Sequence, residues 1–264
     1  MRISHESPIC LLDESRKFND YDYALVHLFE EYPKYYEFFQ KSVEMGREVL
    51  LDNSIFELGV SFSPERFAYW IEQLKPTSYI IPDVLEDMKG TIRSASKWIR
   101  TYRDIKSEKI GVVQGRTVLE IIECYEKLIR LGIERVAIPF DYSLYERIFP
   151  HSNKLVSWAF GRVALINYLI EEEIIDYEVE HHLLGCALPL EFSFYRDDRY
   201  SFLTSLDTSN PIMMSLDNKD YEHYIPLLEK PKTKLFELIK CDMTVEQYHL
   251  VLKNTKYFRK LVKL

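Results

Sequence analysis

The sequence lacks the features that mark secreted, zinc-binding or membrane proteins. Its four cysteines, Cys10, Cys124, Cys186 and Cys241, are widely and irregularly spaced, so we expect reduced thiols rather than disulfides or zinc knuckles. His182 and Cys186 would share one face of a strand, but without a further Cys/His pair nearby a structural role is favoured over a metal site. There is no basic start followed by an apolar run, and no stretch reaches the ~18 apolar residues of a membrane span. These absences predict a cytoplasmic protein without a membrane segment.

The sequence also lacks net positive charge and has few glycines. The net charge is −8, whereas a protein that coats a nucleic-acid duplex non-specifically is usually basic. Any nucleic-acid contact is therefore expected to be local. Only 8 glycines and 11 prolines occur among 264 residues, and no flexible linker is evident. We expect a single domain that covers residues 1–264.

One local basic stretch lies near the end of the chain, and it can be interpreted in two ways. Its members are Lys253, Lys256, Arg259, Lys260 and Lys263. They form either the solvated face of a terminal helix or a patch that contacts phosphates.

The middle of the sequence alternates short apolar runs with amphipathic helical patterns. The runs that indicate buried strands are Val49–Leu51, Tyr79–Ile81, Ile110–Val113, Val136–Ile138, Leu183–Gly185 and Phe202–Leu206. With an early strand near Ile9–Leu12, seven or eight strand–helix repeats result, as is typical of parallel βαβ units. The pattern predicts an α/β fold, a (β/α)8 TIM barrel, with a helical C-terminal tail. Helical stretches around Tyr23–Glu31 and Lys34–Met45 are additional N-terminal helices.

Each strand candidate ends in a polar or conformationally special residue: Asp52, Asp83, Gln114, Pro139 and Asp207. In a parallel barrel these ends meet at the C-terminal mouth, where barrel enzymes carry their chemistry. The ordinary role of such an aspartate is to cap the next helix. Asp52 lies about eleven residues before its helix, and Asp207 precedes the cap and first-turn proline at Asn210 and Pro211. Neither is therefore expected to be a cap.

Three carboxylates and a glutamine suit the exchange of a base on a sugar. One carboxylate can attack the sugar carbon to form a covalent intermediate. A second carboxyl group can give a proton to the departing base and later take one from the incoming base. A third can accept the N1–H and 2-amino protons of guanine, and a glutamine amide can donate to the 6-oxo group.

Four segments that contain these residues resemble, in order, the guanine transglycosylase family, which swaps guanine for a 7-deazaguanine. They are LLDNSIFELG (50–59), IIPDV (80–84), GVVQGRT (111–117) and SLDTSNP (205–211). The resemblance implies that Asp207 is the nucleophile and Asp52 the general acid/base. It also implies that Asp83 reads the guanine edge, with Gln114 and Gly115 in the base pocket.

The sequence looks most similar to the compact, often phage-encoded branch that acts on DNA. HHLLGCALPLEFSFYR (181–196) also resembles that branch, and the Cys-x-Cys-x-x-Cys…His zinc site of the tRNA-acting enzymes is absent. The resemblance implies two substrates, DNA and a free 7-deazaguanine base such as preQ0, and neither a metal nor another cofactor. For a phage-encoded protein the compartment would be the host cytoplasm.

Three further residues, Phe56, Ile138 and Pro139, are assigned to the base pocket. Phe56 is expected either to stack on the base or to pack in the core. The family's Gly-Gly-Leu strand end is replaced here by Ala137, Ile138 and Pro139. Because Pro139 has no N–H, a backbone donor to the base must come from elsewhere.

Other interpretations stay open at this point. The chain could act on tRNA without a zinc site, serve as a non-catalytic nucleic-acid-binding subunit, or be an unrelated glycosidase with paired carboxylates. Candidate phosphate contacts are Arg116, Arg162, Arg196 and Arg199, although a surface ion pair is the ordinary role of each. The identity of the inserted base and the oligomeric state are not assigned.

Overall fold

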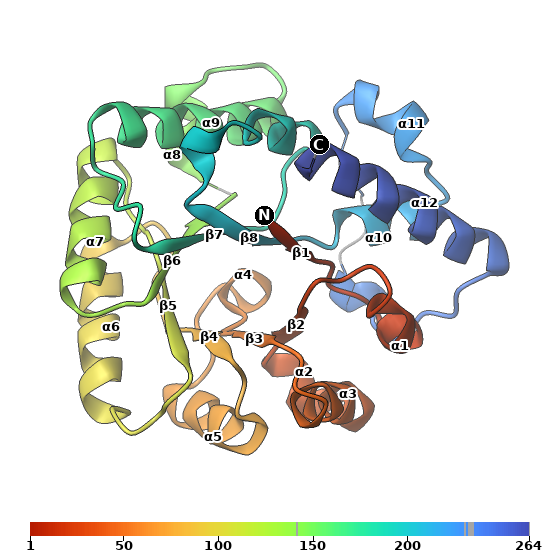
Figure 1. Cartoon of the computed structure of the whole chain (residues 1–264), viewed down its shortest axis with the longest axis horizontal. Helices are drawn as coiled ribbons and strands as arrows, with labels where there is room; N and C mark the ends of the chain where they lie inside the picture. Colours follow the sequence, from red (N-terminus) through yellow and green to blue (C-terminus); the bar gives the residue numbers. More distant parts are fainter. Residues whose placement is uncertain (141, 230, 232–234, 264) are drawn as a thin grey trace. The chain divides into compact units, whose positions relative to one another are not determined.

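A computed structural model describes residues 1–140, 142–229, 231 and 235–263 (Figure 1). Eight strands form one sheet in the order β1-β8-β7-β6-β5-β4-β3-β2. The order follows the sequence, the first strand pairs with the last, and the registered pairs are parallel, as in a (β/α)8 barrel. The predicted fold class is confirmed. The strands are β1 (Arg2–Ser4), β2 (Asp22–Leu25), β3 (Val49–Asp52), β4 (Ser78–Ile80), β5 (Glu108–Val112), β6 (Arg135–Pro139), β7 (Glu180–Leu184) and β8 (Leu203–Asp207).

Helices alternate with these strands. They are α1 (Leu12–Ser15), α2 (His27–Glu31), α3 (Pro33–Glu44), α4 (Ile55–Leu58), α5 (Pro64–Leu74), α6 (Met88–Thr101), α7 (Val118–Arg130), α8 (Ser143–Ile148), α9 (Lys154–Glu171), α10 (Asn210–Leu216), α11 (Tyr221–Tyr224) and α12 (Val245–Val262). The predicted additional helix before β3 (α3) and the helical C-terminal tail (α12) are both present. Within the described residues, no helix is both long and apolar enough to cross a membrane.

Internal contacts divide the chain into two compact units, which we describe separately. The first unit comprises Met1–Asp20, Pro139–Glu178 and Leu183–Leu264, and the second comprises Tyr21–Ile138 and Val179–His182. In the second unit the central strands β3, β4 and β5 overlap the uninterrupted apolar runs Val49–Leu51, Tyr79–Ile81 and Ile110–Val113, whose residues are buried. Such runs are expected for parallel strands that are covered on both faces.

Side-chain capping sets the start of α5, α6 and α7 in the second unit. Ser63 caps α5 and Pro64 occupies its first turn, as predicted. The side chains of Asp87 and Thr117 accept backbone N–H groups at the starts of α6 and α7. Because Asp87 is the cap of α6, Asp83 does not cap that helix.

The first unit contains the β1–β8 pair and the helices near the C-terminus. Arg2 to Ser4 align with Ser205 to Asp207. Helices α10 and α12 pack around a buried cluster made by Leu11, Ile212, Met213, Leu216, Leu235 and Val251. This packing holds the segment that follows β8.

Two sequence predictions about the N-terminal segment are wrong. Ile9–Leu11 is a 3-10 helix rather than a strand, because Leu11 packs into the cluster beside α10 and α12. The segment around Tyr23 is not helical from its start, because Asp22–Leu25 pairs with β3 as a fully buried strand. Tertiary pairing overrides local propensity at such short segments.

Candidate active site

Three of the predicted site residues lie at the ends of neighbouring strands in the second unit. Asp52 is the last residue of β3, Asp83 follows β4, and Gln114 follows β5. The parallel registers of β3 with β4 and of β4 with β5 bring these ends to the same edge of the sheet. The sequence prediction that they converge is therefore confirmed for these three residues.

Asp83 is held by two amide groups. Its carboxyl group is buried, with 2% of the residue exposed, and its two oxygens accept from Asn53 Nδ2 at 2.9 Å and from Gln114 Nε2 at 2.7 Å. The backbone N–H of Glu86 donates to Gln114 Oε1 at 2.8 Å. This last bond fixes the orientation of the glutamine amide, so that its NH2 group lies beside Asp83.

Asn53 is a member of this site that sequence reasoning missed. Its Nδ2 also donates to the carbonyl of Ile81 at 3.0 Å, and its Oδ1 accepts the N–H of Ile55 at 3.0 Å. Three elements are thereby tied together around one buried amide. The sequence offers a signal only in retrospect, since Asn53 directly follows the strand-end aspartate.

The environment of Asp83 favours its protonated form. Burial is the main cause that raises the pKa of Asp83, the bonds from Asn53 and Gln114 lower it, and the nearby charge of Asp52 raises it; the net result is a rise from 3.8 to about 6. A carboxyl group with a pKa in this range changes protonation near neutral pH. Such groups concentrate at functional sites.

Asp52 is held by a hydroxyl group and a backbone N–H. The Tyr23 hydroxyl donates to Oδ2, and the N–H of Ser54 donates to Oδ1. Ser54 adopts the left-handed region, at φ 60°, which turns the chain from β3 into α4 and costs of order 1 kcal/mol. Burial raises the pKa of Asp52, although both donated bonds favour the carboxylate.

Tyr23 is itself fixed by an aromatic neighbour. Its ring stacks on His182, with centroids 6.2 Å apart and an interplanar angle of 13°. Tyr23 lies in β2, the strand that sequence analysis interpreted as a helix, so its approach to Asp52 could not be predicted. The position of β2 beside β3 explains the contact.

The other pocket residues assigned to the second unit differ in exposure. Gly115 is buried against the first turn of α7, where an added Cβ would lie 2.7 Å from the Cβ of Glu120. Ile138 is buried in β6, and Phe56 is 47% exposed on α4. Phe56 is therefore not the core aromatic that was one of its two predicted roles.

Asp207 ends β8 in the first unit and is 3% exposed. Its Oδ1 accepts the backbone N–H of Gly185 at 3.2 Å. Gly185 has a φ of 64°, and a Cβ there would lie 2.3 Å from the ring of Phe140, so only glycine fits. Pro139, also in this unit, ends β6, and its carbonyl accepts the Tyr145 hydroxyl at 2.8 Å.

A fully buried ion pair holds the end of β7 next to Asp207. Arg162 donates to both oxygens of Glu191, at 2.5 and 3.0 Å, and both residues are 0% exposed. The same guanidinium donates to the carbonyls of Leu184 and Gly185 at 2.9 and 3.0 Å. The prediction of Arg162 as a phosphate contact is wrong, because burial makes it a structural clamp.

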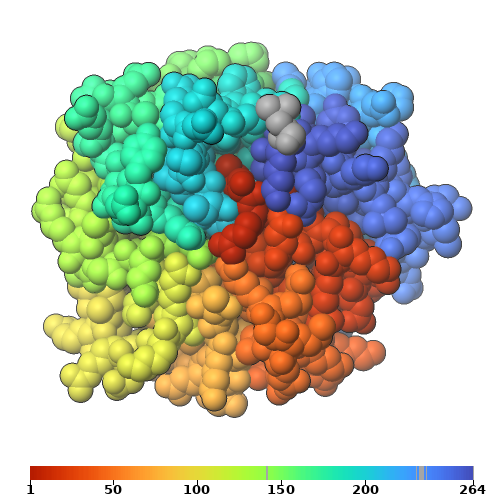
Figure 2. Space-filling view, viewed as in Figure 1, coloured from red at the N-terminus to blue at the C-terminus, as the bar shows by residue number. Residues whose placement is uncertain are grey.

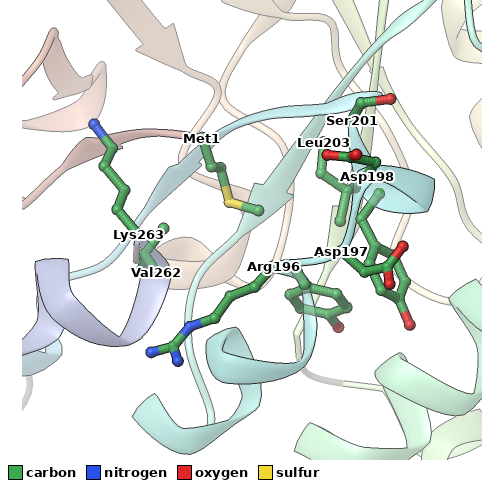
Figure 3. Close-up of a pocket in the computed structure, with 10 residues that line it drawn as sticks. Met1, Arg196, Asp197, Asp198, Ser201, Leu203, Val262 and Lys263 are labelled. Carbon is green, nitrogen blue, oxygen red and sulfur yellow. The ribbon is translucent and has the colours of Figure 1, made fainter.

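Arg196 has a structural role as well. It donates to the carbonyls of Lys260 and Leu261 at the end of α12, at 2.7 and 2.9 Å. Figure 3 shows it beside a cavity of about 370 Å³ whose lining includes Met1, Leu203 and Lys263. Leu203 begins β8 and Asp207 ends it, so this cavity lies at the opposite end of that strand from the proposed nucleophile.

The C-terminal basic stretch is largely neutralised. Lys253 pairs with Asp220 and Glu222, and Arg259 and Lys263 pair with Asp20. These contacts favour the solvated helix face over the phosphate patch. Roles of Arg116 and Arg199 in phosphate binding stay predictions.

Comparison with known proteins adds no family assignment. No protein-family model matches the sequence, and no curated protein is significantly similar to it. The resemblance to guanine transglycosylases thus depends on the four short segments and on the residues that they contain.

Proposed function

We propose that this protein is a DNA-guanine transglycosylase, which exchanges guanine for a 7-deazaguanine of the preQ0 type. The exchange proceeds through a covalent intermediate between Asp207 and the nucleic acid. The observation that carries the proposal is the pair formed by Asp83 and Gln114, whose 2.7 Å bond lies at the strand ends beside Asp52.

This pair has the chemistry needed to recognise guanine. The two oxygens of a carboxylate can accept hydrogen bonds from two adjacent N–H donors. Guanine offers such a pair, N1–H and the 2-amino group, along one edge, whereas adenine and the pyrimidines do not. The NH2 group of Gln114 lies on the Asp83 side because Glu86 holds the amide oxygen. The same NH2 group has a second N–H, which we assign to the 6-oxo group of guanine.

The proposed reaction has two steps. A carboxylate oxygen of Asp207 bonds to the anomeric carbon while the bond from that carbon to guanine breaks, and the base nitrogen takes a proton from Asp52. The incoming 7-deazaguanine then gives its ring N–H proton to Asp52 and bonds to the same carbon, which releases Asp207. Two inversions give net retention of configuration.

The environment of Asp52 suits the acid/base role. An acid that donates a proton near neutral pH needs a pKa above the ordinary value for aspartate. Burial raises the pKa of Asp52 in that direction. The donated hydrogen bonds of Tyr23 and Ser54 orient the carboxyl group.

Covalent trapping tests the proposal. The wild-type protein is incubated with guanine-containing DNA, and the adduct is resolved on a denaturing gel. Asp207→Ala should give no adduct while the circular dichroism spectrum stays that of the folded protein. An adduct with tRNA and none with DNA would favour the tRNA-acting alternative. Base exchange by Asp207→Ala at the normal rate would refute the nucleophile assignment.

A further inference from the structure

Helix α6 carries a row of cations along its solvent-exposed face. Its fourteen residues contain four basic side chains and no acidic one, in a chain whose net charge is −8. The four are Lys89, Arg93, Lys97 and Arg100, and Arg103 follows one turn later. All five are exposed, and in Figure 2 the segment drawn in yellow reaches the surface.

The helical repeat aligns these cations. At 100° per residue, the four within α6 fall inside an arc of about 80° and extend over about 16 Å. The opposite face is formed by Met88, Thr91, Ala95 and Trp98, which are buried. Burial of that face fixes the helix with its cations directed toward solvent.

Arg93, Lys97, Arg100 and Arg103, which we call the α6 row, make no ion pair within the part of the chain that the structure describes. On the neighbouring helix α7, by contrast, Lys127 contacts Glu123 and Arg130 contacts Glu126. Lys89 is not included, because its charge contributes, after the bond from Lys127, to the lowered pKa of Glu123.

A row of cations on one helix face attracts an anionic partner of similar shape. A nucleic-acid strand presents regularly spaced phosphates, and its affinity comes from such contacts. An anionic membrane is less suitable, because a helix that binds a bilayer surface also inserts an apolar face. The apolar face of α6 is buried within the second unit.

We propose that the α6 row binds the sugar-phosphate backbone of a nucleic acid. The inference depends on the proposed function only for the identity of that nucleic acid, DNA. Helix α6 begins five residues after Asp83, and Arg93, the first member of the row, lies five residues further along the helix. In this proposal the α6 row supplies a local positive charge for the phosphates, although the net charge of the chain is −8.

The salt dependence of binding tests the proposal. Binding of a fluorescein-labelled DNA duplex is followed by fluorescence anisotropy over a range of NaCl concentrations. The test variant combines Arg93→Gln, Lys97→Gln, Arg100→Gln and Arg103→Gln, and glutamine keeps helix propensity at these exposed positions. Four lost phosphate contacts should reduce the slope of log K against log salt by about 3 to 4 and weaken binding at least about a hundredfold at 0.1 M salt.

A matched control removes the same charge from paired cations outside α6. Lys17→Gln, Lys127→Gln, Arg130→Gln and Lys253→Gln together should leave the slope nearly unchanged, since each of these side chains is already in an ion pair. Equal losses in both variants would show a general charge effect and overturn the proposal. An unchanged slope in the α6 variant, or no binding by the wild type, would overturn it as well.

Two further measurements, vesicle binding and base exchange, distinguish this proposal from a membrane partner and from the proposed function. If the wild type binds vesicles of phosphatidylcholine and phosphatidylserine but not the duplex, and the α6 variant loses that binding, the partner is a membrane and the nucleic-acid assignment is wrong. If duplex binding depends on the α6 row but no base is exchanged, the proposed function fails and the binding surface stands. If base exchange proceeds with an unchanged KM for DNA in the α6 variant, the surface fails and the proposed function stands.

Discussion

Replacing Asp83 with asparagine is predicted to remove a pH dependence from the stability of the protein. Burial raises the pKa of this carboxyl group from 3.8 to about 6. The folded protein therefore keeps the Asp83 proton at pH values where the unfolded chain has lost it. Its free energy of unfolding falls as the pH rises from about 4 to about 6, and the loss persists above that range.

The size of this loss in unfolding free energy follows from the difference between the pKa values of Asp83 in the folded and unfolded states. At about 1.4 kcal/mol for each pH unit, the loss for this buried group is about 3 kcal/mol. The asparagine side chain does not titrate, so the stability of Asp83→Asn relative to the wild type should rise by about this amount between roughly pH 4 and pH 7. The change with pH is the readout, because an asparagine amide cannot accept from both Asn53 and Gln114 and so shifts the absolute value.

Urea unfolding followed by tryptophan fluorescence over this pH range measures the difference. Asp13→Asn, at a side chain that is 92% exposed, controls for the loss of a surface carboxylate. A difference between Asp83→Asn and wild type that stays constant with pH would refute the reasoning. Asp83 would then titrate as it does in the unfolded chain, and its carboxyl group would not be enclosed.

Two other substitutions test the contacts around the candidate residues. Tyr23→Phe removes a hydrogen bond that favours the charged form of Asp52, so an NMR titration of the Asp52 carboxyl carbon should give a higher pKa than in the wild type; an unchanged or lower pKa would contradict this. Arg162→Met leaves Glu191 buried without a partner and should lower the free energy of unfolding by about 3 to 5 kcal/mol, whereas Arg162→Met combined with Glu191→Leu should recover most of the loss. Equal instability of the single and double variants in urea unfolding would show that the unpaired charge is not the cause.

Part of the fold could be predicted because the four strands β3 to β6 contain uninterrupted apolar runs. Val49–Leu51 and Ile110–Val113 are buried on both faces, and the sequence shows this directly. The three-residue strand Arg2–Ser4 has no such run, and it exists because it pairs with β8. Strands of this kind depend on their neighbours, so local patterns cannot identify them.

The site was only partly predictable for a similar reason. Asp52, Asp83 and Gln114 follow apolar runs, and the barrel rule brings their strand ends together. Asn53 and Tyr23 join them through hydrogen bonds between strands, which depend on side-chain geometry that no spacing in the sequence encodes. Arg162 was predicted to contact phosphate, but it is buried against Glu191. Its burial could not be predicted from its position in the sequence.

The pattern of the α6 row is present in the sequence. Lys89 and three members of the row recur at helical spacing in MKGTIRSASKWIRT without one acidic residue. The overall charge of −8 hides this local pattern, and of the C-terminal lysines Lys253 and Lys263 lie in ion pairs. Charge counted along each helix face is more informative than charge summed over a chain.

The most direct test of the proposed base exchange is nucleoside mass spectrometry of DNA after incubation with the protein and preQ0. The wild type should introduce a 7-deazaguanine deoxynucleoside into the DNA, and Asp207→Asn, which keeps the size of the side chain, should introduce none. Absence of the modified nucleoside with folded wild-type protein, or equal amounts with both proteins, would contradict the account.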